Sequence, residues 1–280
     1  MNHTHSQKLN PLTNHRSLPI DATTMSDILY EQIPLPAAAV NSQLRHFGLS
    51  EEQLVTLLQV STLAGGAAAN IFYNYLNSAN PKPMDSHSDL DFWIHDPHID
   101  KLRHETRDRL YELFNETLRN AGYISYREDL HRQVGIHGSP INYHYTPCIA
   151  DHQRFAYQRA FAVQGATRII CNWWAKEDPE TGATKRIQLI FTSRLIADTL
   201  MDFDFAVCRA ALSCRSHGTY QLQWSGQCEK VMRDRLMFLH YMPTHEPDQK
   251  NKRLWKYAKR YNIKIFCPDG SPFTPNIMDE

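Results

Sequence analysis

The chain has 280 residues, of which 42% are hydrophobic and 21% are charged, so it can bury the core of a globular protein. Its 30 lysines and arginines balance its 30 acidic residues, and a formal net charge of zero argues against binding nucleic acid or membranes through overall charge. No apolar run has the length of a bilayer span, so we expect no membrane partner. Binding of a charged ligand would have to come from a local patch.

The start of the chain, MNHTHSQKLN, is polar and lacks the basic-then-apolar order of a secretory signal. We expect residues 1–45 to form a mobile N-terminal segment and a lead-in to the folded core. The six cysteines are widely spaced and include no CxxC pair, which indicates reduced thiols. The expected location is therefore the cytoplasm, or a host-cell cytoplasm if the protein is viral or a delivered effector.

Helices and one short strand are predicted for the segment before residue 122. Ser50 and Gln53 have the spacing of a capping box, which predicts a helix over about 51–59. Apolar spacing and turn residues predict the later elements, which are a helix over 67–76, a strand over 90–95 and a helix over about 100–121.

A β-hairpin is predicted in the second half of the chain. Strand-like residues 168–174 and 186–191 are joined by a turn over 178–182. The preceding residues, 123–165, are aromatic, rich in histidine and poorly periodic, and they support no assignment.

A helical pattern resumes over about 194–212, and the chain is predicted to be mostly helical from there to residue 261. Strands and helices together predict an α/β (mixed) fold. We expect a core over residues 46–205 and a helical C-terminal domain over residues 206–280.

Asp89 and Asp91 carry the sharpest chemical signal in the sequence. Side chains alternate across a strand, so the two carboxylates should point to one face while Leu90 points to the other. Two adjacent carboxylates repel each other unless a cation lies between them, and their oxygens suit Mg²⁺ or Mn²⁺. A solvated strand edge is the alternative explanation of an Asp-x-Asp pair.

Gly65 and Gly66 precede the helix expected over 67–76. A glycine pair at the start of a helix can present bare backbone N–H groups, which commonly bind phosphate. Close packing between helices is the alternative reason for two such small residues.

A Gly-Gly pair, a helix and a Ser-Asp-x-Asp strand, in this order, resemble the DNA polymerase β-like nucleotidyltransferase superfamily over roughly residues 48–205. The resemblance implies a nucleotidyltransferase-like core with a mixed sheet, an NTP as substrate and Mg²⁺ or Mn²⁺ as cofactor. It implies separate residues for the two kinds of contact: Gly65, Gly66 and Ser88 for the triphosphate, and Asp89 and Asp91 for the metal.

Three further motifs resemble uncharacterised nucleotidyltransferase-like proteins of viruses and microbes. This second resemblance bears on the fold and names no substrate. The motifs are Gln188-Leu189-Ile190, Phe203-Asp204-Phe205 followed by Cys208, and Arg253-x-x-Lys256-Tyr257-x-x-Arg260.

The superfamily places a third carboxylate on a later strand beside the first two acids. The matching strand here is 186–191, and its polar residue on the expected face is Gln188. Glutamine can offer a carbonyl oxygen to a cation, but it cannot act as a base. Asp202 and Asp204 are the nearest replacements, and we assign the catalytic role to Asp204; a helix cap or a buried ion pair is the alternative.

Arg253, Lys256, Tyr257 and Arg260 have the spacing of one face of a helix. Such a basic face suits a triphosphate or an RNA backbone, and Tyr257 could stack on a base. We expect Lys256 and Arg260 to bind the nucleotide. A solvated helix face is the alternative, and packing of this helix near Gly66 would favour the functional interpretation.

A rival candidate site lies in the histidine-rich middle of the chain. Its residue types suit zinc, but their spacing matches no known zinc module, and ordinary hydrogen bonding is the alternative. A zinc-stabilised interaction module would be built from His131, His137, His144, Cys148 and His152.

Together these features predict a metal-dependent nucleotidyltransferase that moves a nucleoside monophosphate from an NTP to an acceptor hydroxyl on RNA, a protein or a small molecule. The alternative is a catalytically degenerate member of the same fold that acts as a nucleotide- or partner-binding module, because Gln188 replaces an acid. The sequence has no Gly-x-Ser-x-Gly elbow, no phosphate-binding P-loop and no His-Glu-x-x-His helix, which argues against the enzyme classes that use them.

Overall fold

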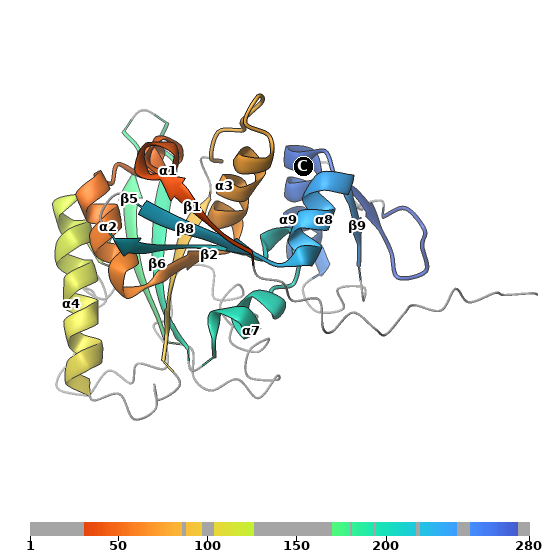
Figure 1. Cartoon of the computed structure of the whole chain (residues 1–280). Coiled ribbons are helices and arrows are strands. Elements are labelled where there is room, and N and C mark those ends of the chain that lie inside the picture. Colours follow the sequence, from red (N-terminus) through yellow and green to blue (C-terminus); the bar gives the residue numbers. More distant parts are fainter. Residues whose placement is uncertain are drawn as a thin grey trace, which may run out of the picture.

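The computed structural model describes most of the chain between residues 31 and 273. The described ranges are 31–85, 88–96, 104–125, 170–179, 181–192, 194–216, 219–239 and 247–273. Within them the chain forms a mixed sheet of eight strands with helices packed against it (Figure 1), which confirms the α/β (mixed) fold class. None of the helices in these ranges combines the length and apolar character of a membrane span.

The sheet has the strand order β1-β8-β7-β2-β3-β6-β5-β4. Its described neighbours pair antiparallel except β3 and β6, which run parallel at the centre. The bounds of the strands are β1 Glu31–Pro36, β2 Thr62–Ala64, β3 Asp89–His95, β4 Ile124–Ser125, β5 Ile170–Glu177, β6 Thr184–Thr192, β7 Ala210–Ser216 and β8 Thr219–Trp224.

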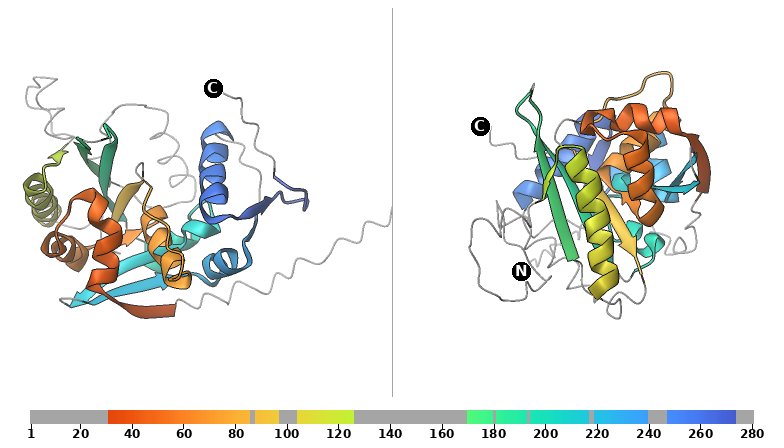
Figure 2. Two further views of the ribbon diagram at one scale, coloured as in Figure 1. Left: turned by 90° about the horizontal axis from the view of Figure 1, so that it is seen from above. Right: turned by 90° about the vertical axis from the view of Figure 1, so that its left-hand side faces the viewer.

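The helices cover the sheet and extend past one end of it. In Figures 1 and 2, α4 lies at one end of the sheet, and α8 and α9 lie together with the short parallel pair of β9 and β10 at the other. The bounds are α1 Ala37–Leu44, α2 Glu51–Val60, α3 Gly66–Leu76, α4 His104–Asn120, α7 Ile196–Met201, α8 Gly226–Asp234 and α9 Pro247–Tyr261, with 3₁₀ turns η2 Arg45–Phe47 and η3 Ala206–Cys208 and strands β9 Leu236–Phe238 and β10 Lys264–Phe266.

Apolar side chains pack on both faces of the sheet, and β3 contributes to both. Leu90 and Phe92 lie in the larger cluster, whereas Trp93 lies in a smaller cluster on the other face. Because side chains alternate along a strand, Asp89 and Asp91 share the face of Trp93. The alternation expected for this segment is therefore confirmed.

The elements with strong local signals form where they were predicted. Ser50 Oγ accepts a hydrogen bond from Gln53 N at 3.1 Å, and Gln53 Oε1 accepts one from Ser50 N at 2.8 Å, so the capping box starts α2 as expected. The helices expected over 67–76 and 100–121 are α3 and α4, and the expected hairpin is β5 and β6.

The expectation that residues 206–280 are helical is wrong for β7 and β8, which are strands of the main sheet, and for β9 and β10, which form a second sheet. Tyr220, Leu222 and Trp224 are buried and alternate with polar residues, which is the two-residue period of a strand. The helix expected over about 194–212 is shorter than predicted. It ends at Met201, and the chain after it forms η3 and then β7. Only α8 and α9 continue the predicted helical pattern within the described part of this segment.

The end of the expected lead-in is also part of the folded core. Residues 31–44 form β1 and α1, and Val40 and Leu44 are fully buried. Pro34 and Pro36 fit an edge strand, where a missing N–H removes no sheet hydrogen bond. The rest of the expected mobile segment, residues 1–30, and the zinc candidates of 131–152 lie outside the described residues.

Candidate active site

The turn between β2 and α3 positions the two glycines. Gly65 has φ 91° and ψ −146°, a conformation that residues with a Cβ rarely adopt. Its N–H donates to Ala210 O at 3.2 Å, and its own carbonyl accepts the first helical bond from Ala69 N at 2.9 Å. The chain therefore enters α3 through a conformation that specifically favours glycine.

The N-terminus of α3 carries no side-chain cap and no acidic residue in its first turn. The first N–H groups of a helix have no partner within the helix, and the helix dipole makes this end positive. An anion is the ligand that such a helix end favours, as the glycine pair predicts.

Asp91 lies beside this turn. Ala64, the residue before the glycines, pairs with Asp91 across β2 and β3. A Cβ added to Gly65 would lie 3.6 Å from Asp91 Oδ2. Asp89 precedes Asp91 by two residues on the same face of β3, so the glycine turn lies beside the carboxylate pair.

Both carboxylates are held in an environment that disfavours their charge. Burial, and then the charge of Asp89, raise the pKa of Asp91 from 3.8 to about 7, and Arg253 opposes the shift. Burial also raises the pKa of Asp89, against the charges of Arg186, Lys256 and Arg253. Asp91 Oδ1 is enclosed, and within the described chain it has no hydrogen-bond partner. An enclosed carboxylate oxygen without a donor fits a divalent cation as ligand.

Gln188 occupies the place where the resemblance predicts a third acid. The parallel register of β3 and β6 pairs Asp91 with Gln188 and Asp89 with Arg186. The strand predicted to lie beside the carboxylates is therefore β6, and its residue at that level is the amide. Within the described ranges, no group of three His, Cys, Asp or Glu side chains is placed to hold a metal ion.

Asp204 lies close to Arg253, with 3.6 Å between its Oδ2 and the Arg253 Nη1. The Arg253 guanidinium also lies 5.4 Å from the centre of the Phe205 ring. Arg253 thus links Asp204 electrostatically to Asp89 and Asp91, on whose pKa values its charge acts. Asp204 does not complete a three-ligand group with them, and its catalytic role stays a prediction. Asp202, the other nearby acid, pairs with Arg194.

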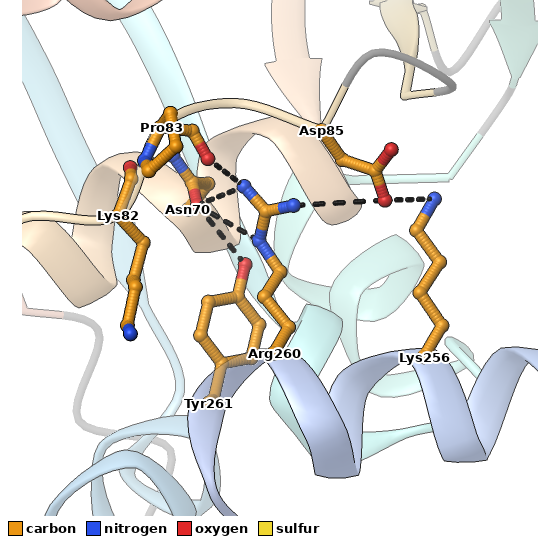
Figure 3. A network of polar contacts seen from close by, with 7 residues as sticks. All are labelled: Asn70, Lys82, Pro83, Asp85, Lys256, Arg260 and Tyr261. Atoms are coloured by element: carbon orange, nitrogen blue, oxygen red, sulfur yellow. Dashed lines mark hydrogen bonds and ion pairs between the residues drawn. The ribbon is translucent and has the colours of Figure 1, made fainter.

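Helix α9 packs against α3 through a polar network (Figure 3). Arg260 donates to Asn70 Oδ1 from Nη2 at 2.8 Å and from Nε at 3.2 Å, and it also donates to the carbonyl of Pro83. Asp85 Oδ2 lies 3.0 Å from Lys256 Nζ and 3.6 Å from Arg260 Nη1. Arg260 therefore holds α9 in place, and a nucleotide contact by Arg260 would require it to leave these partners.

Tyr257 is part of the same packing. A Cβ added to Gly66 would lie 3.0 Å from the Tyr257 hydroxyl, so α9 does pack over the glycine pair. The ring centre of Tyr257 lies 6.3 Å from those of Phe205 and Tyr261, and its hydroxyl and the Cys208 thiol are hydrogen-bonded. Burial is the main reason that the pKa of Tyr257 is raised. With these neighbours, Tyr257 is engaged in packing and not free to stack on a base.

Two contributions to this site were not predicted from the sequence. Asp85, which pairs with Lys256 and Arg260, carries no motif and lies in the loop before β3. Its spacing indicates Arg253 only as a member of a basic face, yet its charge acts on both carboxylates. The features that could have indicated this role of Arg253 are the helical spacing of the basic face and the acidic residues around it. Ser88, the remaining predicted residue, directly precedes the pair, with its N–H bonded to Asp85 O at 2.9 Å.

No family model matches this chain, and no curated protein matches it. Membership of the nucleotidyltransferase superfamily therefore stays a prediction. Its support is the geometry around β3 and the N-terminus of α3.

Proposed function

We propose that this protein is a metal-dependent nucleotidyltransferase, which moves a nucleoside monophosphate from an NTP to an acceptor hydroxyl. The observation that carries the proposal is the position of Asp91 beside the uncapped N-terminus of α3. A Cβ added to Gly65, at the start of that helix, would lie 3.6 Å from Asp91 Oδ2. A helix end that favours an anion and a carboxylate that suits a cation therefore lie side by side. A metal-bound triphosphate is a ligand that needs both.

Each group has a role in this proposal. Asp89 and Asp91 would hold Mg²⁺ or Mn²⁺, and the bound ion would neutralise phosphate charge and polarise the acceptor hydroxyl. The N–H groups at the start of α3 would bind phosphate oxygens. Arg253 and Lys256, whose charges act on Asp89, would offset the remaining negative charge of the triphosphate. The acceptor oxygen would then bond to the α-phosphorus as the bond from that phosphorus to pyrophosphate breaks, and the hydroxyl proton would pass to Asp204, the base assigned from the sequence.

A second function is favoured by one specific observation, the pairing of Gln188 with Asp91. An amide at this level cannot take the proton of the acceptor hydroxyl. The same site could therefore bind a nucleotide or a partner without turnover. This degenerate binding module is the alternative that the experiment must separate from an enzyme.

The test is transfer of label from each NTP, radiolabelled at the α-phosphate, with Mg²⁺ or Mn²⁺ and with RNA, protein and small-molecule fractions as acceptors. The matched variants are Asp89→Ala/Asp91→Ala and Glu112→Ala/Glu116→Ala, whose glutamates are exposed on α4. Label that is lost only in the aspartate variant supports the enzyme and names the acceptor class. Metal-dependent NTP binding without transfer supports the binding module. Absence of both NTP binding and transfer would sink the enzyme and the nucleotide-binding form of the module.

A further inference from the structure

Helix α9 has a second basic face, directed away from the core. The outer stripe consists of Lys252, Trp255, Lys256 and Lys259. Each of these residues is three or four positions away from two of the others, so they share one side of the helix. Lys252, Trp255 and Lys259 are exposed, and Lys256 is half-buried. The opposite side of the helix is buried through Leu254, Ala258 and Tyr261.

Trp255 is the unusual member of the outer stripe. Its exposed fraction is 43%, and among the described residues it makes no ring contact. A tryptophan ring carries a large apolar surface, and covering that surface is favourable. The ring is therefore placed to be covered by a flat apolar group of a partner.

The lysines around Trp255 give the stripe its charge. Neither Lys252 nor Lys259 forms a salt bridge within the described ranges, and Lys256 shares Asp85 with Arg260. The only acidic residue in the sequence of α9, Asp248, belongs to its first turn. The chain as a whole has a formal net charge of zero, so this is a local cationic surface.

The helix that carries the stripe is firmly attached. Arg260 bonds to the buried Asn70 of α3, and Leu254 has no exposed surface. Because the backbone under the stripe is held in place, a ligand would not have to order it on binding, which favours affinity.

We propose that the outer stripe of α9 binds a single-stranded nucleic acid, with Trp255 stacked on a base and the lysines against flanking phosphates. Every base has a π-face, and alternating cations and aromatic rings are how proteins bind single strands without reading their sequence. A lipid surface fits less well, since Trp255 is the stripe's only large apolar residue and the other apolar positions face the core.

The stripe also lies next to the carboxylate site. Lys256 belongs to the stripe, and its Nζ lies 3.0 Å from Asp85 Oδ2. The carbonyl of Asp85 accepts a hydrogen bond from the N–H of Ser88, the residue before Asp89. A strand bound along α9 would therefore pass close to Asp89 and Asp91, where its terminal hydroxyl could serve as acceptor. The binding surface stands on its own geometry, whereas its use for an acceptor rests on the proposed function.

The test is fluorescence anisotropy of the full chain with labelled single strands of about ten nucleotides, one of RNA and one of DNA. EDTA is present and NTP is left out, so that binding is measured apart from transfer. We expect Trp255→Ala to weaken binding about tenfold and Trp255→Phe to keep most of the affinity, because Phe retains a π-face. Log affinity falls with log salt, and Lys252→Ala and Lys259→Ala should each make that slope shallower by about 0.7.

Matched control variants lie on other helices. Tyr75→Ala removes a ring of similar exposure, 45%, from α3, and Arg109→Ala removes an exposed cation from α4. Both should leave affinity and salt dependence unchanged. The RNA and DNA arms show which strand is bound.

Equal affinity of the wild type and Trp255→Ala for both strands would overturn the proposal. So would Trp255-dependent binding to phosphatidylserine vesicles without binding to either strand. Asp89→Ala should bind strands as the wild type does and lose only transfer. If the wild type binds strands through Trp255 but transfers nothing, the surface is supported and the proposed function fails separately.

Discussion

Asp91 and Gln188 lie opposite each other in the parallel pair of β3 and β6 at the centre of the sheet. Paired residues of neighbouring strands point to the same face, so the Gln188 amide lies on the side of the enclosed Asp91 carboxylate. An amide carbonyl can bind a hard cation, but it adds no negative charge and takes up no proton. The site thus combines two carboxylates with a neutral third group.

Gln188→Glu should convert this neutral group into an acid. We expect tighter Mn²⁺ binding, and transfer that is faster by about a hundredfold, because a positioned general base typically contributes at least that much. In EDTA the same variant should be less stable than the wild type, since three carboxylates then lie together without a cation. Isothermal titration with Mn²⁺ and the transfer assay measure the first two effects, and urea unfolding in EDTA measures the third. Gln223→Glu, the same change at a half-buried position of β8, is the control; unchanged Mn²⁺ affinity in Gln188→Glu would contradict the assignment of this position to the metal site.

Asp91 should make the metal-free protein less stable as the pH rises. Below the usual pKa of 3.8 the carboxyl is protonated in both the folded and the unfolded state. Between 3.8 and about 7 the folded state keeps a proton that the unfolded state releases, so the free energy of unfolding falls with pH. At 1.4 kcal/mol per pKa unit the full loss, present above pH 7, is up to about 4 kcal/mol. Asp91→Asn should therefore unfold at higher urea concentrations than the wild type at about pH 8 in EDTA, and at similar ones at about pH 4.

With Mg²⁺ at about pH 8, the wild type should be more stable than Asp91→Asn, which is the reverse of their order in EDTA. Mg²⁺ binds the ionised carboxylate, so it should stabilise the wild type more at about pH 8 than at about pH 6. Asp91→Asn should gain little at either pH. Asp234→Asn, which changes an exposed aspartate on α8, should respond to pH and Mg²⁺ as the wild type does. An equal gain from Mg²⁺ in Asp91→Asn would show that the ion binds elsewhere.

The sequence was sufficient for elements whose signal is local. A capping box, a helical stripe and the alternation of a strand are each defined by residues close together in the sequence. The elements α2, α4 and β3 form where these patterns predict them. The convergence of Gly65 with Asp91 was also predictable, although only through a resemblance, because it depends on the pairing of β2 with β3.

Elements defined by distant partners were not predictable in this way. Strand β7 lies between β2 and β8. Its sequence, AALSCRS, shows no clear alternation of apolar and polar residues, so its strand structure depends on pairing with these neighbours and not on a local pattern. Asp85 and Asn70 meet Arg260 across a separation that no spacing rule covers. The same holds for Tyr257, whose ring packs against Gly66, a contact that the spacing of its basic neighbours does not predict.

Gly66 and Tyr257 should be energetically coupled. Ala has a higher helix propensity than Gly, by about 1 kcal/mol, but a Cβ at position 66 would lie 3.0 Å from the Tyr257 hydroxyl. Gly66→Ala should therefore destabilise the wild type and be neutral or stabilising in a Tyr257→Phe background, where that oxygen is absent. Urea unfolding of the four proteins gives the coupling, which we expect to be about 1 kcal/mol. Additive effects of the two substitutions would contradict the close approach of α9 to α3.

Arg260 and Lys256 should differ in their contribution to the attachment of α9. The Arg260 side chain is 15% exposed and bonds to the buried Asn70, whereas the Lys256 side chain is 36% exposed and has a single described partner, Asp85. A hydrogen-bonded buried guanidinium contributes about 1.5–3 kcal/mol, and an exposed ion pair about 0–1 kcal/mol. We therefore expect Arg260→Ala to lower the free energy of unfolding by more than Lys256→Ala, and to speed proteolysis of the segment around α9. Equal losses in the two variants would mean that α9 is held by its apolar side alone, through Leu254 and Ala258, and that the network in Figure 3 contributes little.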